Sequence, residues 1–342
     1  MAHCITASDV AAAYSRVSPH VHRTPVLTNS HLTICSNRSN VLFKCEAFQK
    51  TGSFKFRGAT NAVLSAKEEN PTVAAVVTHS SGNHAAALAL AGKTASVAPY
   101  IIMPNTAPAA KRAAVTDTYK ANVTLVEPTG EARQAGADKV LGEIPGSIFI
   151  HPSEDPRVIA GQGTVCVEFM EQTEEVLGAG AKLDVVIIPV GGGGLASGNS
   201  VALRAKWGAE CKIVLAEPAL VDDAKRSFES GTLQKHEGGK AKPSAADGLL
   251  TTLGPNTFHI IKDLVDDIIT VSERDILIGT KTVWERMKIM IECSAGVGVA
   301  VLLSDEFKTK YPADKYKNVG VILCGGNVDI VKVAQRMKDE GI

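Results

Sequence analysis

The stretch VVIIPVGGGGLASGNSVALRAKW, residues 185–207, joins an apolar run typical of a strand, four consecutive glycines and a run typical of a helix. Gly191 to Gly194 let several backbone N–H groups converge on one anion, and a phosphate there would also meet the positive end of the helix dipole. A simple tight turn needs only one or two glycines, so four favour a phosphate site over a flexible turn. The pattern is neither G-x-G-x-x-G nor G-x-x-x-x-G-K-[ST], which argues against dinucleotide and nucleoside triphosphate loops.

Seven more apolar, β-branched runs lie along the chain, near residues 41, 73, 100, 123, 147, 213 and 319, with helical stretches between them. Strands that alternate with helices indicate parallel sheets covered by helices. Four of the runs, between about residues 73 and 150, form a compact series, and the runs before and after it can form a second sheet. We therefore predict an α/β protein with two open twisted parallel-sheet domains: a large domain of residues 1–70 and 152–342, and a small domain of residues 73–150 inserted in it.

The overall composition points to small-molecule chemistry. Lys plus Arg and Asp plus Glu both total 36, so no net charge favours nucleic acid or an anionic membrane as a partner. The seven cysteines are scattered and form no C-x-x-C pair, which indicates free thiols in a reducing compartment. No apolar run approaches the roughly 18 residues that span a bilayer, and the first residues do not resemble a secretory signal. We expect a cytoplasmic protein.

Lys55 lies in QKTGSFKFRG, residues 49–58, between Phe54 and Phe56. A desolvated lysine has a lowered pKa and can form a Schiff base with an aldehyde. In isolation, a lysine between two phenylalanines is more often a solvated surface residue. The segment is therefore a candidate nucleophile that needs support from the rest of the chain.

Two more strand ends carry small polar residues. THSSGNH, residues 78–84, follows the run near residue 73, at the kind of strand end where open α/β sheets bind ligands. Its backbone N–H groups could hold a carboxylate, and the alternative is a helix start capped by Ser80 or Ser81. Cys324 to Asn327 follow the run near residue 319, where a buried thiol is more often simple packing.

In this order, the four segments resemble the fold-type-II pyridoxal-phosphate (PLP) enzymes, which have the tryptophan synthase β-like fold, and within them the branch of serine racemases and threonine dehydratases. The resemblance extends over nearly the whole chain. Its motifs include TPVLT at 24–28, FQKTGSFKFRGA at 48–59, VVTHSSGNH at 76–84, IPVGGGG at 188–194, AGVGVA at 295–300 and GGNVD at 325–329.

The resemblance implies a set of cofactor contacts. Lys55 would hold PLP as a Schiff base, Gly191–Gly194 would bind the PLP phosphate, and Asn83 would bond the ring hydroxyl oxygen. Cys324 stands beside the expected pyridine nitrogen, where a neutral partner leaves that nitrogen largely unprotonated and weakens the ring as an electron sink. Ser153 stands near the cofactor, where the family usually has Asn.

The activity implied by the resemblance is interconversion of L- and D-serine, with β-elimination of serine to pyruvate and ammonia. Racemisation needs acid/base groups on both faces of the cofactor, and Lys55 and Ser81 match the family positions for them. A serine hydroxyl titrates far above neutral pH, and His79 and the PLP phosphate are candidates for activating it. The implied substrate-binding residues are Ser80, Ser81, Gly82, Asn83, His84, His79 and Arg133.

The family also binds a divalent cation, at positions matched here by Glu217, the carbonyl of Val221 and Asp223. Hard oxygen ligands suit Mg²⁺, and Ca²⁺ or Mn²⁺ as alternatives. Without the resemblance, two carboxylates six residues apart would be read as a solvated face.

Metazoan members of the branch bind ATP as an effector at a dimer interface, and a homodimer is the family expectation. Asn29, His31 and Ala86 depart from the mammalian-like pattern, which leaves ATP activation open. The positions that match the ATP site are Ser30, Lys50, Thr51, Tyr119, Lys288 and Asn327.

Three alternatives remain open at this point. The chain could be a dehydratase for L-serine, L-threonine or 3-hydroxyaspartate without significant racemisation. It could be an aspartate racemase, although Glu154 and Asp155 would repel a second substrate carboxylate unless they point away or Arg157 offsets them. Outside catalysis, it could be a silent ligand-binding protein on the same fold, which the intact Lys55 argues against.

Overall fold

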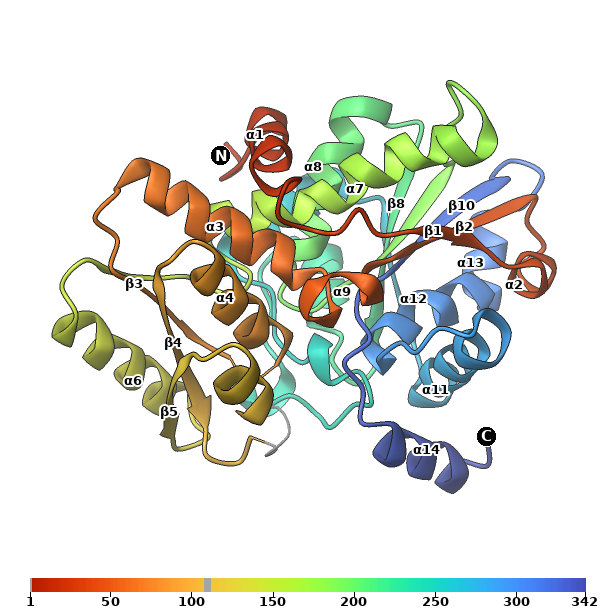
Figure 1. Ribbon diagram of the computed structural model, residues 1–342. Helices are drawn as coiled ribbons and strands as arrows, with labels where there is room; N and C mark the ends of the chain where they lie inside the picture. The colour runs from red at the N-terminus through yellow and green to blue at the C-terminus, as the bar shows by residue number, and fades with distance from the viewer. Residues whose placement is uncertain (1, 81, 108–111) are drawn as a thin grey trace.

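The computed structural model of the chain describes residues 2–80, 82–107 and 112–342 and contains two sheets (Figure 1). The six-stranded sheet has the order β1-β2-β10-β7-β8-β9 and the four-stranded sheet the order β5-β4-β3-β6. β1 runs antiparallel to β2, and the other paired strands run parallel. The strands are β1 (Val26–Thr28), β2 (Asn40–Cys45), β3 (Ala75–His79), β4 (Ala98–Pro104), β5 (Asn122–Val126), β6 (Ser147–Phe149), β7 (Val185–Pro189), β8 (Lys212–Pro218), β9 (Asp267–Val271) and β10 (Asn318–Leu323).

The four-stranded sheet is an insertion in the chain that builds the other sheet. β3 to β6 follow one another between residues 75 and 149, whereas the six-stranded sheet takes β1 and β2 from before and β7 to β10 from after. The predicted α/β fold with an inserted small unit is confirmed. All eight predicted apolar runs form strands, and β1 and β9 are strands that the sequence analysis did not predict.

Helices cover both faces of the six-stranded sheet: α7 and α8 lie on one side and α11 and α12 on the other (Figure 1). The helices are α1 (Ala7–Val17), α2 (Ser30–Cys35), α3 (Lys55–Glu69), α4 (Asn83–Thr94), α6 (Gly130–Glu143), α7 (Pro156–Leu177), α8 (Gly194–Trp207), α9 (Asp223–Ser230), α10 (Pro255–Leu264), α11 (Glu273–Thr282), α12 (Cys293–Leu303), α13 (Asp305–Lys310) and α14 (Ile330–Asp339). No described helix is long and apolar enough to cross a membrane.

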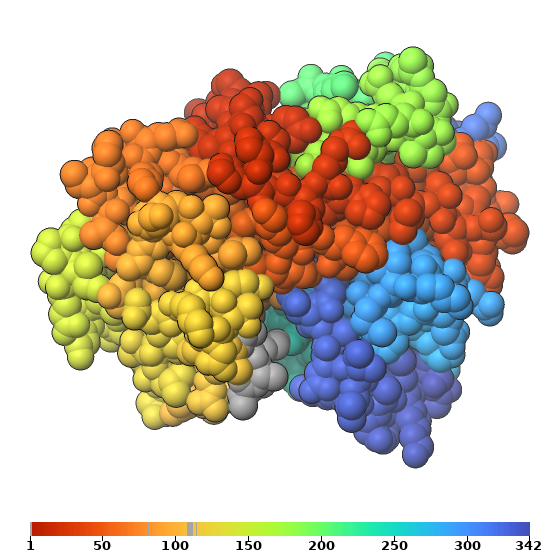
Figure 2. Space-filling model, viewed as in Figure 1, coloured from red at the N-terminus to blue at the C-terminus, as the bar shows by residue number. Residues whose placement is uncertain are grey.

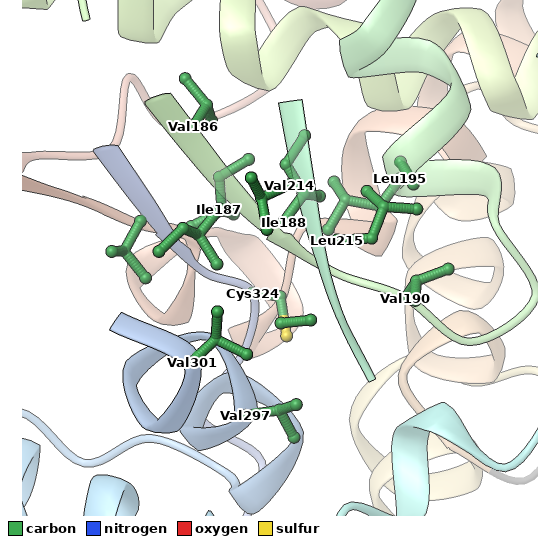
Figure 3. Close-up of a cluster of buried hydrophobic side chains, with 14 of the residues drawn as sticks. Val186, Ile187, Ile188, Val190, Leu195, Val214, Leu215, Val297, Val301 and Cys324 are labelled. Carbon is green, nitrogen blue, oxygen red and sulfur yellow. The ribbon is translucent and has the colours of Figure 1, made fainter. Parts of the chain in front are cut away.

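The buried core of the six-stranded sheet holds the carboxyl ends of β7 and β10 in place. Every residue of β7 is buried, as expected for a central strand with helices on both faces. Side chains of β7 and β8 pack with Leu195 of α8 and with Val297 and Val301 of α12 (Figure 3). Cys324 lies at the end of the same cluster, so the exits of β7 and β10 are held side by side.

Helix α3 connects the two units. It packs against α7, which covers the large sheet, and against α4, which covers the small one. Phe56, Ala59 and Val63 of α3 belong to the same buried cluster as residues of α4. The predicted domain limit at residue 70 therefore stays a prediction. In the space-filling view the surface is hollowed between the small unit, orange to yellow, and the C-terminal segments in blue (Figure 2).

Candidate active site

A cavity of about 790 Å³ lies where the strand ends of both sheets meet the starts of α3, α4 and α8. Carboxyl ends of parallel strands are the usual ligand sites of open α/β sheets. All predicted cofactor-binding residues line this cavity: Lys55, Asn83, Ser153, Gly191–Gly194 and Cys324. So do the predicted substrate-binding residues His79, Ser80, Gly82, Asn83, His84 and Arg133. Ser81 lies outside the described residues.

The amine of Lys55 faces this cavity rather than the protein surface. Its Nζ donates a hydrogen bond to the carbonyl oxygen of Pro152 at 2.9 Å and lies 5.1 Å from the ring centre of Phe54. Burial lowers the pKa of Lys55 to about 8, although Cys324 and Glu292 act in the opposite direction. Roughly a tenth of the amine is therefore unprotonated at pH 7, and this is the form that attacks an aldehyde.

The four glycines form a cradle in which a side chain at Gly191, Gly192 or Gly193 would clash with its neighbours. A Cβ at Gly191 would lie 2.8 Å from the Cα of Leu249, and one at Gly192 would lie 2.7 Å from Oγ of Ser153. Gly193 has a φ of +82° and is the N-cap of α8, where no side chain caps the helix. The first backbone N–H groups of α8 are thus left for a ligand, which fits the phosphate of PLP.

Asn83, the first residue of α4, has a fixed side-chain orientation. Its Nδ2 donates to both carboxylate oxygens of Glu292, at 3.0 and 3.1 Å, and its Oδ1 accepts from Nδ2 of Asn327 at 2.8 Å. The N-cap of α4 is Gly82, and within the described residues no side chain caps this helix, so Ser80 is not its cap. Glu292 lines the cavity and was missed in the sequence, where a lone acidic residue gives no signal.

Three histidines from different elements meet at the small-unit side of the cavity: His79, His84 and His151. The rings of His79 and His151 contact edge to face, with centres 5.8 Å apart. His84 is buried, and neither of its ring nitrogens makes a hydrogen bond within the described residues. Burial lowers the pKa of all three, well below the usual value for His84 and to about 4 for His151. The cluster is therefore uncharged at neutral pH.

The thiol of Cys324 is also uncharged. The side chain is 2% exposed, and burial raises its pKa well above the ordinary value, with Glu292 acting in the same direction. A neutral thiol suits the position beside a pyridine nitrogen that the resemblance gives it, because it neither donates a full charge to the ring nor needs a counter-ion.

The acidic pair after His151 points away from the cavity. The carboxylate of Glu154 accepts hydrogen bonds from the backbone N of Asn256 at 2.8 Å and from Oγ1 of Thr257 at 2.7 Å, at the start of α10. Asp155 is the N-cap of α7 and pairs with Arg157 at 2.7 Å. Neither carboxylate lines the cavity, and Arg157 is already paired, so this segment neither repels nor attracts an acidic substrate.

The predicted metal ligands are buried, which makes the solvated-face alternative wrong. Glu217 and Asp223 are each 2% exposed, and burial raises the pKa of both carboxyl groups. Glu217 accepts from the backbone N–H groups of Ala224 and Lys225, and Oδ1 of Asp223 lies 3.5 Å from Nδ1 of His236. Among the described residues, no three His, Cys, Asp or Glu side chains are arranged to hold a metal ion, so a cation at Glu217 and Asp223 would need main-chain or water oxygens besides.

The residues that match the ATP site lie outside the cavity lining. Nδ2 of Asn327 donates to the carbonyl oxygen of Thr51 at 2.8 Å. Thr51 and Lys288 both have positive φ angles, +65° and +60°, which are costly for residues with a side chain. Nζ of Lys50 donates to the carbonyl oxygen of His20.

The buried amine, the glycine cradle and the two-sheet architecture define a PLP-dependent enzyme of fold type II. Comparison with known families agrees. The family described as pyridoxal-phosphate dependent enzyme matches residues 17–325, and the chain belongs to that family.

Within the family, the chain is similar to serine racemases. It is 44% identical to the serine racemase of Homo sapiens over 98% of this chain and 96% of the human protein. A crystal structure of serine racemase from Dictyostelium discoideum superposes with a TM-score of 0.86 at 44% identity, over 95% of this chain and 99% of that one.

The chain is also similar to relatives with other activities. The beta-hydroxyaspartate dehydratase of Paracoccus denitrificans is 39% identical over 96% of this chain and 98% of its own length. A crystal structure of a PLP-dependent aspartate racemase has a TM-score of 0.88 at 36% identity, over 97% of this chain and 98% of that one.

Proposed function

We propose that this enzyme interconverts L- and D-serine and also eliminates water from serine to give pyruvate and ammonia. The observation that carries the proposal is the convergence of the Lys55 amine, the glycine cradle and the start of α4 on one cavity. The similarity to serine racemases over nearly the whole chain supports serine as the substrate.

Each part of the cavity has a distinct task in this reaction. PLP, when bound, supplies an electron sink that acidifies the α-hydrogen of the amino acid joined to it. Lys55 moves the α-proton on its own face, and Ser81 serves the opposite face. The backbone N–H groups at the start of α4, with the buried ring of His84 beside them, hold the substrate carboxylate. Because His79 is uncharged, it can accept a proton from a neighbouring hydroxyl.

The test is a product analysis with purified enzyme, PLP and Mg²⁺. L-Serine, L-threonine and L-aspartate are supplied separately, and D-enantiomers and keto acids are measured. We expect D-serine and pyruvate from L-serine, loss of both in Lys55→Ala, and loss of D-serine with some remaining pyruvate in Ser81→Ala. Keto acid without any D-amino acid would make the enzyme a dehydratase. A purified protein without the visible absorbance of lysine-bound PLP would revive the non-catalytic alternative.

An acidic hydroxy amino acid, 3-hydroxyaspartate, is a second candidate substrate. Arg133 and Lys235 are among the residues that line the cavity, and Glu154 and Asp155 are engaged elsewhere. The resemblance to a beta-hydroxyaspartate dehydratase points the same way. Elimination from 3-hydroxyaspartate should fall in Arg133→Gln while elimination from serine changes little, and equal loss for both substrates would argue against this role of Arg133.

We further propose Mg²⁺ at Glu217, the carbonyl of Val221 and Asp223, since two buried carboxyl groups with raised pKa values gain from a cation. ATP as an effector is supported by the residues that match the family's ATP site and by the strained backbone of Thr51 and Lys288. An initial rate that does not change with ATP concentration at constant Mg²⁺ would rule out ATP activation. A homodimer is supported by exposed apolar side chains such as Ile34, which is 77% exposed. A cytoplasmic location is supported by seven free cysteines.

A further inference from the structure

His151, which directly follows the end of β6 and Ile150, is held in a single tautomer. Its Nδ1 accepts hydrogen bonds from the backbone N–H groups of Ser153 at 3.2 Å and Glu154 at 3.0 Å. A ring nitrogen that accepts two such bonds carries no proton, so the proton of the neutral ring is on Nε2. The turn after β6 therefore fixes His151 as a hydrogen-bond donor at Nε2.

The surroundings of His151 keep the ring neutral. Burial lowers its pKa to about 4, and His79 and Lys55 act in the same direction, while Asp155 opposes them weakly. The two nearest carboxylates are occupied, Glu154 at the start of α10 and Asp155 with Arg157. The titratable and charged groups around the ring are Lys55, Glu69, His79, His84, Glu154, Asp155 and Arg157.

The donor is free to bind a ligand. Nε2 is on the far side of the ring from Nδ1 and so points away from the Ser153–Glu154 turn. His151 lines the cavity, and its Nε2 makes no hydrogen bond with the part of the chain that the structure describes. Pro152, the next residue, holds the amine of Lys55, so the ring lies beside the reacting end of the cavity.

The proposed function assigns the substrate carboxylate to the start of α4, so the N–H donor of His151 is left for a neutral oxygen acceptor. The proposed substrate carries one such oxygen besides its carboxylate, the hydroxyl on Cβ. We propose that Nε2–H of His151 donates a hydrogen bond to the β-hydroxyl oxygen of the substrate, which makes His151 the residue that selects serine over alanine. This inference rests on the proposed function, because it assumes a hydroxy amino acid in the cavity.

Two substitutions separate this role from the structural one. In His151→Asn, the side-chain Oδ1 can replace Nδ1 as the acceptor for the turn, but no group replaces the Nε2 donor. In His151→Gln, the amide N–H can replace the Nε2 donor, but the turn loses its acceptor. Exchange of the α-proton for deuterium, followed by proton NMR with the PLP-loaded enzyme, reports deprotonation of both L-serine and L-alanine. Alanine is also tested as a competitive inhibitor of serine exchange.

We expect His151→Asn to lower kcat/KM for serine about tenfold relative to alanine, the size of one lost hydrogen bond. His151→Gln should keep the preference for serine, even if both substrates react more slowly. The ratio of kcat/KM for serine between wild type and His151→Asn should stay constant from about pH 6 to pH 9, because the neutral ring is the donor throughout.

The opposite pattern would overturn the assignment. If His151→Asn keeps the preference and His151→Gln loses activity with both substrates, His151 acts only through its turn. If His79→Asn, the matched control in the same cluster, removes the preference for serine over alanine instead, His79 binds the β-hydroxyl of the substrate. A ratio that changes near pH 6.5 would mean that a charged ring is the donor. A wild-type enzyme that exchanges neither substrate would refute the proposed function itself, which is a different result from any of these.

Discussion

The sharpest stability prediction concerns a buried group of four charged side chains beneath the segment that carries Lys55. Lys44 of β2 and Arg57 of α3 are fully buried, and both contact Glu168 of α7 at 2.8 Å. Arg57 also pairs with Glu46 at 2.8 Å. The group holds two positive and two negative charges, so it is neutral as a whole.

Glu168→Gln leaves one positive charge unbalanced in the interior. Removing one partner of a buried pair costs about 3–5 kcal/mol, against a total stability of about 5–15 kcal/mol for a folded protein. We expect a large fall in the urea midpoint, measured by far-UV circular dichroism with PLP present. Because Arg57 follows Lys55 by two residues, the affinity for PLP should fall as well.

Glu175→Gln is the matched control on the same helix. Glu175 pairs with Arg23 at 2.6 Å, but both side chains are about half exposed, so the loss should be at most about 1 kcal/mol. Adding Lys44→Met to Glu168→Gln restores neutrality and should recover part of the stability. If Glu168→Gln costs no more than Glu175→Gln, the group does not act as a closed set of charges and the reasoning fails.

Three other predictions follow from the site. The rate at which the apoenzyme binds PLP should rise with pH up to about 8 and then level off. The reason is that the unprotonated amine of Lys55 is the reactive form and its pKa is about 8. A stopped-flow rate of PLP binding that keeps rising to pH 10 would contradict this. Gly192→Ala should weaken PLP binding at least about tenfold in an absorbance titration, because the new Cβ would lie 2.7 Å from Oγ of Ser153. The control is Gly142→Ala on α6, where the new Cβ meets open space, and it should leave PLP binding unchanged. Mg²⁺ should raise the thermal midpoint of the wild type and not that of Asp223→Asn, and an equal rise in both would place the cation elsewhere.

The strands could be predicted wherever burial on both faces requires a continuous apolar run. β7 and β10 are of this kind. β1 has only three residues, and β9 begins at Asp267, directly after Asp266, so neither strand stands out by hydrophobicity. Asp266 is acceptable there because it pairs with Lys212 at 3.0 Å, a contact between segments that no local pattern reveals.

The candidate site was predictable for the groups that sit in motifs. The glycine loop, Lys55 and the start of α4 each have a local signature tied to a strand or helix end. Glu292 and the donor role of His151 have none, because each depends on a partner set by the fold. The bond between Asn83 and Glu292 joins residues 209 positions apart. The orientation of Glu154 likewise depends on α10, about 100 residues later.

The position of β10 has a consequence for how the chain is made in the cell. β10 lies between β2 and β7, so the large sheet cannot close until residue 323 has left the ribosome, whereas the strands of the small unit are complete at residue 149. At a translation rate of roughly 5–20 residues per second, the small unit has roughly 10–35 s in which to fold before β10 is made. During this time β2 and β7 lack their common neighbour and keep unpaired edges. A chain that terminates before β10 would keep those edges, and we expect it to be recovered as aggregates.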